Sequence, residues 1–138
     1  MTQSISAKVQ ANIGRSGIAN WLGFSAQLIE EQLAYHLTFN EAHIGNPAIR
    51  ALHGGAIAAF LEFAAQCELV DKLEPGAAIK TINADFNYLA SSRAQDMEGS
   101  AIITRLGRRI AFVEATGWQQ SKDRPVAKAM FRFRIGGD

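Results

Sequence analysis

The stretch LHGGAIAAFLEFAAQCELV, residues 52–70, decides the fold, because a pair of glycines leads into a long apolar segment. From about Gly55 to Lys72, apolar residues occupy every helical face, and nearly all of them are favoured or tolerated in helices. A helix that is apolar on all sides is a buried helix. The residues EPG at 74–76 then end it. We therefore predict one long, buried helix over residues 55–72.

Alternating apolar and polar residues predict strands on both sides of this helix. One strand precedes it at residues 32–38, and four follow it at residues 81–88, 97–105, 110–118 and 126–135. In the first of the four, Ile82, Ala84, Phe86 and Tyr88 are expected on one face, with Thr81, Asn83, Asp85 and Asn87 on the other.

Strands joined by short turns form an antiparallel sheet, and a single apolar helix must be covered by that sheet. The prediction is an α+β fold in which a curved antiparallel sheet wraps around one long central helix. Residues 19–31 are expected to form a short helix on the sheet edge. At 138 residues the chain is expected to be a single domain, residues 1–138.

Composition excludes several classes of function. The net charge is +1, which gives no electrostatic footprint for nucleic acid. The first 17 residues lack the apolar core of a signal peptide, and no segment is apolar enough for a membrane span. We therefore expect a cytoplasmic protein with no nucleic-acid or membrane partner. The one cysteine, Cys67, lies among apolar residues and is expected to be a buried packing residue.

Gly54 and Gly55 stand directly before the predicted helix. Backbone N–H groups at a helix start have no partner inside the helix, and glycines put no side chain in the way of a ligand. Such a site suits an oxygen that carries negative charge, as in an oxyanion hole. The alternative is that the two glycines only allow a tight turn where the loop and the helix pack closely.

Glu62 lies inside the apolar segment, where a charged and unpaired carboxylate would cost several kcal/mol. Such a cost indicates a use for the acid. The alternatives are a buried salt bridge or a helix face that reaches solvent.

Gly54 and Glu62 are too far apart to act together within one helix. Eight residues separate them, or roughly 12 Å at 1.5 Å per residue, whereas a reacting carbonyl lies about 3 Å from both its donors and its attacking group. If they cooperate, the N–H comes from one subunit and the carboxylate from another. A two-fold dimer then has two equal sites at its interface.

The motif NP…LHGGAIAAFLE resembles that of the hotdog-fold acyl-CoA thioesterases, in the branch of phenylacetyl-CoA and 4-hydroxybenzoyl-CoA thioesterases. The shared pattern is Asn-Pro, then His-Gly-Gly, then an acid nine residues after the histidine, which is Glu62 here. The stretches NADFNYL and LGRRIAFVEA are similar to the third strand and the following hairpin of that family. The resemblance covers roughly Leu22 to Ile135.

The resemblance implies a role for each site residue. The N–H of Gly54, helped by Gly55, would polarise the thioester carbonyl. Glu62 would act as nucleophile or as general base, two mechanisms that the sequence leaves open. His53 would orient the loop or bind near the thioester, and Asn46 would help to place the attacking water or the carbonyl.

The sequence departs from the family pattern in three places. The loop before HGG is one residue longer and lacks the glycine after Asn-Pro. Gln66 stands where the family often has Ser or Thr, and Ala90 stands where many members have an arginine suited to CoA phosphates. Arg93, Arg108 or Arg109 would replace that arginine, with solvated turn charges as the alternative. The acyl pocket candidates, by position, are Phe60, Phe63, Phe86 and Tyr88.

The expected function is therefore hydrolysis of an acyl-CoA, with a mild preference for aromatic acyl groups, by a homodimer that forms a tetramer. The alternative is a binding protein of the same fold that holds an acyl thioester without hydrolysing it. A hydratase of this fold is not supported, because the histidine-containing motif that is typical of such hydratases is not evident in this sequence. His36, His43 and His53 lack the spacing of a zinc site, and no phosphate or dinucleotide loop occurs. No metal and no cofactor are expected, and coenzyme A enters only as part of the substrate.

Overall fold

The computed structural model describes residues 2–136 of the chain. Its helices are α1 (Ala7–Gly14), α2 (Gly17–Leu22) and α3 (Gly54–Lys72), with a 3-10 turn at Glu41–His43. Its strands are β1 (Thr2–Gln3), β2 (Phe24–Ile29), β3 (Gln32–Leu37), β4 (Ile44–Asn46), β5 (Ala51–Leu52), β6 (Ile79–Tyr88), β7 (Met97–Leu106), β8 (Ile110–Trp118) and β9 (Ala127–Ile135).

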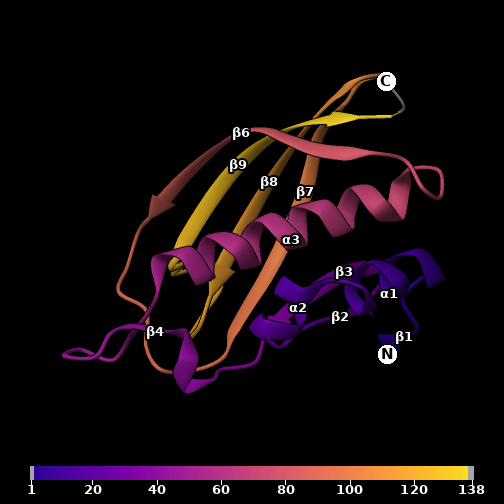
Figure 1. Cartoon of the computed structure of the whole chain (residues 1–138). Coiled ribbons are helices and arrows are strands. Elements are labelled where there is room, and N and C mark those ends of the chain that lie inside the picture. The colour runs from indigo at the N-terminus through magenta and orange to yellow at the C-terminus, as the bar shows by residue number, and fades with distance from the viewer. Residues whose placement is uncertain (1, 137–138) are drawn as a thin grey trace.

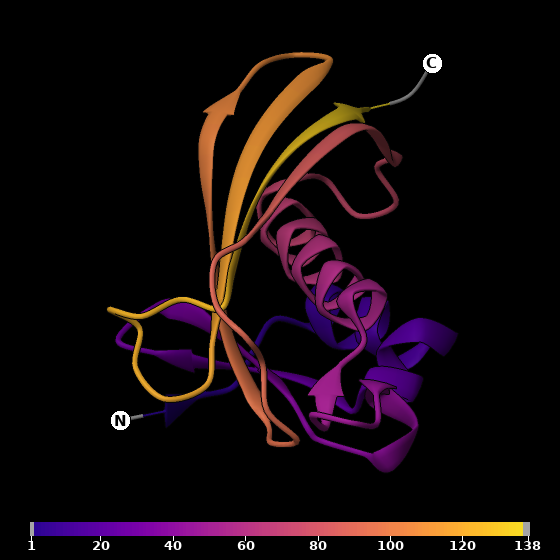
Figure 2. The same ribbon diagram turned by 90° about the vertical axis from the view of Figure 1, so that its left-hand side faces the viewer.

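Seven of these strands form one antiparallel sheet in the order β1-β2-β3-β7-β8-β9-β6, and β4 pairs with β5 in a separate hairpin. The long helix α3 crosses one face of the curved sheet, and α1 and α2 lie beside it over the β2–β3 end (Figure 1). Figure 2 shows the sheet nearly edge on, with α3 on one side of it only. The predicted α+β fold, one long helix against a curved antiparallel sheet, is confirmed.

The core lies between α3 and strands β7, β8 and β9. Phe60, Leu61 and Ala64 of α3 are fully buried, and the inward residues of β9 alternate with exposed ones as predicted. Gly99 of β7 lets the sheet pack closely against α3, because a Cβ atom there would lie 2.8 Å from the ring of Phe60. Within residues 2–136, no helix is both long enough and apolar enough to cross a bilayer.

The helix α3 starts one residue before the predicted boundary, and it is not buried on every face. Ala59, Glu62, Gln66 and Val70 are only half-buried, and their spacing of three or four residues puts them on one side of the helix. We call these four residues the open stripe of α3. The prediction of burial on all sides is wrong, because the sheet covers one side of α3 and α1 and α2 cover only part of the rest.

The N-terminal region also differs from the prediction of a helix over residues 19–31. Gly23 ends α2 with a φ of +62°, a left-handed conformation that favours glycine. Residues 24–29 then form β2, and the turn at Glu30 and Glu31, both with positive φ, returns the chain into β3. The helix is therefore confined to residues 17–22.

Strand β6 lies at the edge of the sheet and pairs with β9, so the chain crosses the sheet before it enters β7 beside β3. A β-bulge between Thr81 and Asn83 shifts the register of β6, so that Thr81 lies opposite Phe133 and Ala84 opposite Phe131. Both Thr81 and Ala84 therefore face α3, whereas Ile82 is 49% exposed. The predicted grouping of Ile82 with Ala84, apart from Thr81, is wrong because the bulge adds a residue.

Candidate functional site

The β4–β5 hairpin delivers the chain to the start of α3. The N–H of His53 donates to the carbonyl of His43 at 2.7 Å, which ties the end of the hairpin to the preceding turn. Gly45 packs directly against the backbone of His53, since a Cβ atom at Gly45 would be 2.6 Å from the Cα of His53. The glycine in β4 is thus needed for the hairpin to hold His53 in place.

His53 caps the helix. Its Nδ1 accepts a hydrogen bond from the N–H of Gly55 at 2.9 Å, so in the neutral ring the proton sits on Nε2, which can donate. The Gly55 N–H is therefore engaged within the protomer. Among the described residues, the N–H of Gly54 makes no hydrogen bond, and its carbonyl accepts one from the hydroxyl of Tyr88 at 2.8 Å. Gly54 supplies the free donor at the positive end of the helix dipole.

Glu62 lies two turns further along, on the open stripe. Its Oε2 accepts a hydrogen bond from the hydroxyl of Thr81 at 2.5 Å, and among the described residues its Oε1 has no such partner. The carboxylate opens into a pocket of about 210 Å³ that is also lined by Ile18, Ala59, Phe63 and Gln66. Glu62 is half-buried and accessible rather than largely desolvated, and neither oxygen makes an ion pair within residues 2–136.

Sequence reasoning missed Thr81. Strict alternation put its side chain on the face away from the helix, and only the bulge in β6 turns it toward Glu62. A bulge depends on the register of the partner strand, so the sequence of β6 alone carried no signal for it.

The helix is continuous from Gly54 to Lys72, so the separation of roughly 12 Å between Gly54 and Glu62 holds within one protomer. The structure does not bring the two groups together in the single chain. Any reaction that uses both needs a second copy.

The aromatic candidates separate into two groups. Phe60 is fully buried in the core and Phe63 borders the Glu62 pocket. Phe86 and Tyr88 stack with ring centroids 6.5 Å apart on β6, and the Tyr88 hydroxyl reaches the first turn of α3. Phe60 therefore packs the protein interior, Phe63 is buried at the border of the Glu62 pocket, and Tyr88 reaches the helix start.

Asn46 and Arg93 lie elsewhere. The Oδ1 of Asn46 accepts a hydrogen bond from the N–H of Ala48 at 3.1 Å and so stabilises the hairpin turn. Arg93 is exposed in the loop after β6, where its backbone bonds the side chain of Gln119. Neither residue lines the Glu62 pocket.

Gln66 borders a second cavity of about 500 Å³ between α1 and the C-terminal half of α3. Its apolar lining comes mainly from Val70, Leu73 and Ile79, and Lys8 of α1 crosses toward the helix end. Gln66 also lines the Glu62 pocket, so both spaces border this residue.

Arg108 and Arg109 line a third space, an open groove of about 610 Å³ near the β7–β8 turn. The groove lies on the outer face of the sheet, away from α3, because Phe112 and Arg132 in its lining alternate with buried residues of β8 and β9.

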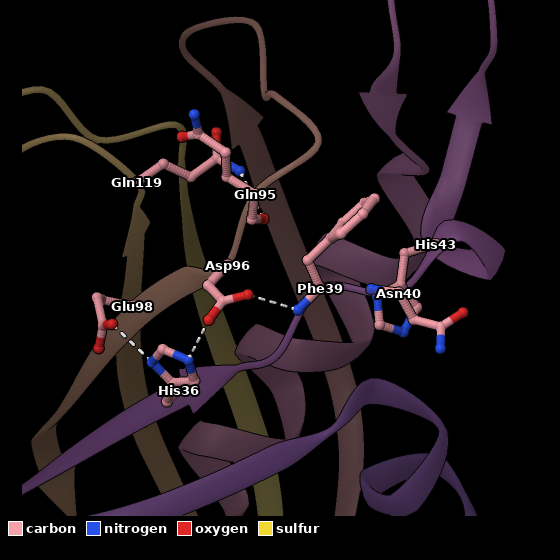
Figure 3. Close-up of polar contacts among 8 residues, drawn as sticks. All are labelled: His36, Phe39, Asn40, His43, Gln95, Asp96, Glu98 and Gln119. Carbon is pink, nitrogen blue, oxygen red and sulfur yellow. Dashed lines mark hydrogen bonds and ion pairs between the residues drawn. The ribbon is translucent and has the colours of Figure 1, made fainter.

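A polar cluster outside these spaces joins β3 to β7 (Figure 3). His36 lies between two carboxylates, with Nδ1 2.6 Å from Glu98 and Nε2 2.8 Å from Asp96, and Asp96 also accepts from the N–H of Phe39. Partial burial disfavours the charged ring, but the hydrogen bonds to Asp96 and Glu98 outweigh it and raise the pKa of His36. Both ring nitrogens are occupied, and no group of three potential metal ligands suited to an ion occurs within residues 2–136.

Two ionisable groups on another side of α3 are removed from the pocket. Cys67 is fully buried, and burial raises the pKa of its thiol to about 12, in keeping with a packing role. Burial also raises the pKa of Glu68 to about 7. Burial raises the pKa of the Tyr35 hydroxyl, and the nearby carboxylate of Glu68 raises it further. Within the described chain that hydroxyl has no partner in hydrogen-bond geometry.

Comparison with protein-family models finds a match over residues 43–134 to the acyl-CoA thioesterase N-terminal domain. The matched segment contains the helix start, Glu62 and the sheet strands that cover α3. No curated protein matches the chain.

Solved structures share the fold over almost the whole chain. A phenylacetic acid degradation-related protein from Ralstonia eutropha JMP134 is 22% identical, with a TM-score of 0.80 and coverage of 92% of this chain and 98% of that one. A Bacillus halodurans protein solved with CoA is 18% identical, with a TM-score of 0.80 and coverage of 99% and 98%. A Haemophilus influenzae thioesterase is 16% identical, with a TM-score of 0.78 and coverage of 96% and 92%.

Proposed function

Because the chain belongs to the family of the acyl-CoA thioesterase N-terminal domain, we propose that it hydrolyses an acyl-CoA to a carboxylic acid and free CoA. The observation that carries this proposal is the setting of Glu62. Its side chain lies on the open stripe of α3 and lines a pocket; Thr81 donates to one carboxylate oxygen, and the other has no hydrogen-bond partner among the described residues. A carboxylate that is fixed at one oxygen and free at the other is suited to attack a carbonyl or to take a proton from water.

The two chemical routes differ in what Glu62 bonds. As a nucleophile, its oxygen adds to the thioester carbon, CoA leaves as a thiolate that takes up a proton, and water then cleaves the resulting anhydride. As a general base, it removes a proton from water while the water oxygen attacks the carbon; the C–S bond then breaks, and the CoA thiolate leaves and takes up the proton. Both routes give the same products, and both build negative charge on the carbonyl oxygen, which needs a donor about 3 Å away.

We assign that donor to the Gly54 N–H of a second protomer. The separation of the two groups within one chain supports this assignment, as does the open stripe of α3, which a partner helix would cover. The edge of β6 has no strand beyond it within residues 2–136, so it can pair with the same edge of the second copy. In this dimer two equal sites lie at the interface, and pairing of two dimers gives the tetramer.

His53 then acts as a positioning residue, because its ring fixes the first turn of α3 through Gly55. The acyl group extends from the Glu62 pocket past Gln66 into the cavity between α1 and α3. Phe63 on this path favours acyl groups with an apolar or aromatic body. The cytoplasm is the proposed site of action.

Thiol release from a panel of aliphatic and aromatic acyl-CoAs tests the proposal. The variant Glu62→Gln should lose at least about 100-fold in kcat, since it keeps the shape of the side chain but cannot act as base or nucleophile. The matched control is Glu114→Gln, which alters an exposed acid on the outer face of β8 and should leave kcat unchanged. Full activity of Glu62→Gln on every hydrolysed ester would refute the catalytic role.

The second candidate, an acyl-thioester binding protein, is favoured by Gln66 in place of the family's Ser or Thr. It predicts no thiol release from any ester together with tight binding that survives Glu62→Gln. Calorimetric titration with the same panel separates the two functions.

A further inference from the structure

The cavity between α1 and the C-terminal half of α3 has two unlike walls. The wall formed by α1 is polar, and its long side chains are those of Lys8, Asn12 and Arg15. Their spacing of four and three residues puts them on one side of this helix and its end. The opposite wall is apolar and is formed mainly by Val70, Leu73 and Ile79. One space thus combines an apolar surface with hydrogen-bond donors and positive charge.

Two of the three polar side chains are engaged within the protomer. The ammonium group of Lys8 donates to the carbonyls of Asp71 and Leu73, at 3.2 and 2.8 Å. These carbonyls lie at the negative end of the α3 dipole, which offsets the charge of Lys8. The Nδ2 of Asn12 donates to the sulfur of Cys67 at 3.7 Å. Lys8 and Asn12 therefore tie α1 to the long helix.

Arg15 is the cation that remains available to a ligand. Its guanidinium makes no ion pair within residues 2–136, and Glu74, the one acid among the described residues of the lining, makes none either. Arg15 is exposed, so it borders a part of the cavity that water reaches. An anionic group bound there keeps part of its hydration and avoids most of the cost of burying a charge.

We propose that Arg15 binds a carboxylate at the end of the acyl group remote from the thioester, so that the preferred substrates are CoA monothioesters of dicarboxylic acids. The guanidinium fork matches the two oxygens of a carboxylate, and the apolar wall covers the methylene groups between the two ends. This inference rests on the proposed function, which places the acyl group in this cavity.

The helix α3 sets the length of acyl group that fits. Gln66, which borders both the Glu62 pocket and the cavity, lies about 6 Å beyond Glu62 along the helix axis, and Val70 lies about 12 Å beyond it. Adipyl and suberyl groups are long enough to pass Gln66 while the thioester stays at Glu62, whereas a succinyl group is too short. The acyl group enters at Glu62 and stays beside α1 and α3 of one protomer, so a partner helix over the open stripe would roof this path.

Matched pairs of esters test the inference. Adipyl-CoA is compared with hexanoyl-CoA, and suberyl-CoA with octanoyl-CoA, because the members of each pair differ only in the distal carboxylate. Arg15→Gln should lower the ratio of kcat/KM, diacid ester over plain ester, by at least about fivefold through the loss of charge-assisted hydrogen bonds. Arg15→Lys should keep part of the preference. The matched control is Arg124→Gln, at an exposed arginine outside the cavity, which should leave the ratio unchanged.

The ratio separates the acyl end from the CoA end, since CoA is common to both members of a pair. If Arg15→Gln weakens both members equally, Arg15 acts on the CoA part and the inference is overturned. An unchanged ratio in Arg15→Gln, or an equal fall of the ratio in Arg124→Gln, also overturns it. Thermal melts check that each variant folds.

Calorimetric titration of Glu62→Gln with the same pairs measures the preference without turnover. If no ester is hydrolysed by the wild type, but the ratio of dissociation constants shifts when Arg15→Gln is added to Glu62→Gln, the carboxylate site is supported and the hydrolysis is not. If esters are hydrolysed and neither ratio depends on Arg15, the hydrolysis stands and the carboxylate site is refuted.

Discussion

Replacing Gly54 with proline would remove one backbone N–H from the start of α3 while leaving the helix able to form. Gly54 is the first residue after the N-cap, where the N–H has no partner inside the helix and proline is well tolerated. His53 has φ −61° and ψ 131°, an extended conformation that a residue before proline adopts. A Cβ atom at Gly54 would lie 3.5 Å from the Tyr88 hydroxyl, an ordinary contact.

From this geometry we expect the stability of Gly54→Pro to stay within about 1 kcal/mol of wild type. Loss of a single oxyanion donor should lower kcat by about 100- to 1000-fold. Gly54→Ala is the matched control, because it adds the same Cβ atom and keeps the N–H, and it should remain active. Steady-state kinetics on one acyl-CoA and urea unfolding measure the two quantities.

Mixing Gly54→Pro protomers with Glu62→Gln protomers then tests the shared site. In a mixed dimer, one site combines an intact Gly54 with an intact Glu62, and the other site lacks both. Random exchange makes about half of the dimers mixed, so activity should recover to about a quarter of wild type. Each variant alone stays inactive. If co-expressed, separately tagged protomers assemble and show no recovery, the assignment of the two groups to different chains is refuted.

Three further predictions concern residues around the site. Stability should fall as pH rises from about 4.5 through about 7, because burial raises the folded-state pKa of Glu68 to about 7. Urea unfolding at pH 5 and pH 8 measures this fall. In Glu68→Gln the fall should be smaller by about 1 to 2 kcal/mol, after allowance for the partial exposure of Glu68. Thr81→Val should lower kcat by about tenfold with an unchanged melting temperature, because Glu62 loses the donor that fixes it; unchanged kinetics would show that this bond is incidental. Gly45→Ala should cost about 1 to 3 kcal/mol of stability, since the new Cβ would meet His53 backbone, and a neutral effect in urea unfolding would contradict the close packing of the hairpin.

The sequence predicted the central elements well, since their hydrophobic patterns are strong and local. The helix α3 starts within one residue of its predicted position, and β9 buries the alternate residues that were expected. Both patterns arise from burial against a single surface, which periodicity reports directly.

The errors have non-local causes. The bulge in β6 turns Thr81 inward, and it depends on the register of β9. The open stripe of α3 depends on how much of the helix the other elements cover, which composition does not report. Gly23 ends α2 in a left-handed conformation, and the prediction of a longer helix did not allow for a helix end at this glycine. For the candidate site, the sequence pointed to Gly54 and Glu62, and these stay predictions; Arg105 and Arg132 became neighbours of Arg108 only through strand pairing.

The bulge also bears on the solubility of the protomer. Within residues 2–136, the ten residues of β6 have no strand on their outer side, and an edge of this length is a template on which further chains can stack. The register shift between Thr81 and Asn83 interrupts this template, so that an incoming strand pairs without a break only along the residues on one side of it. The irregularity that orients Thr81 would thus also hinder newly made protomers from growing into fibres before they find a matching copy.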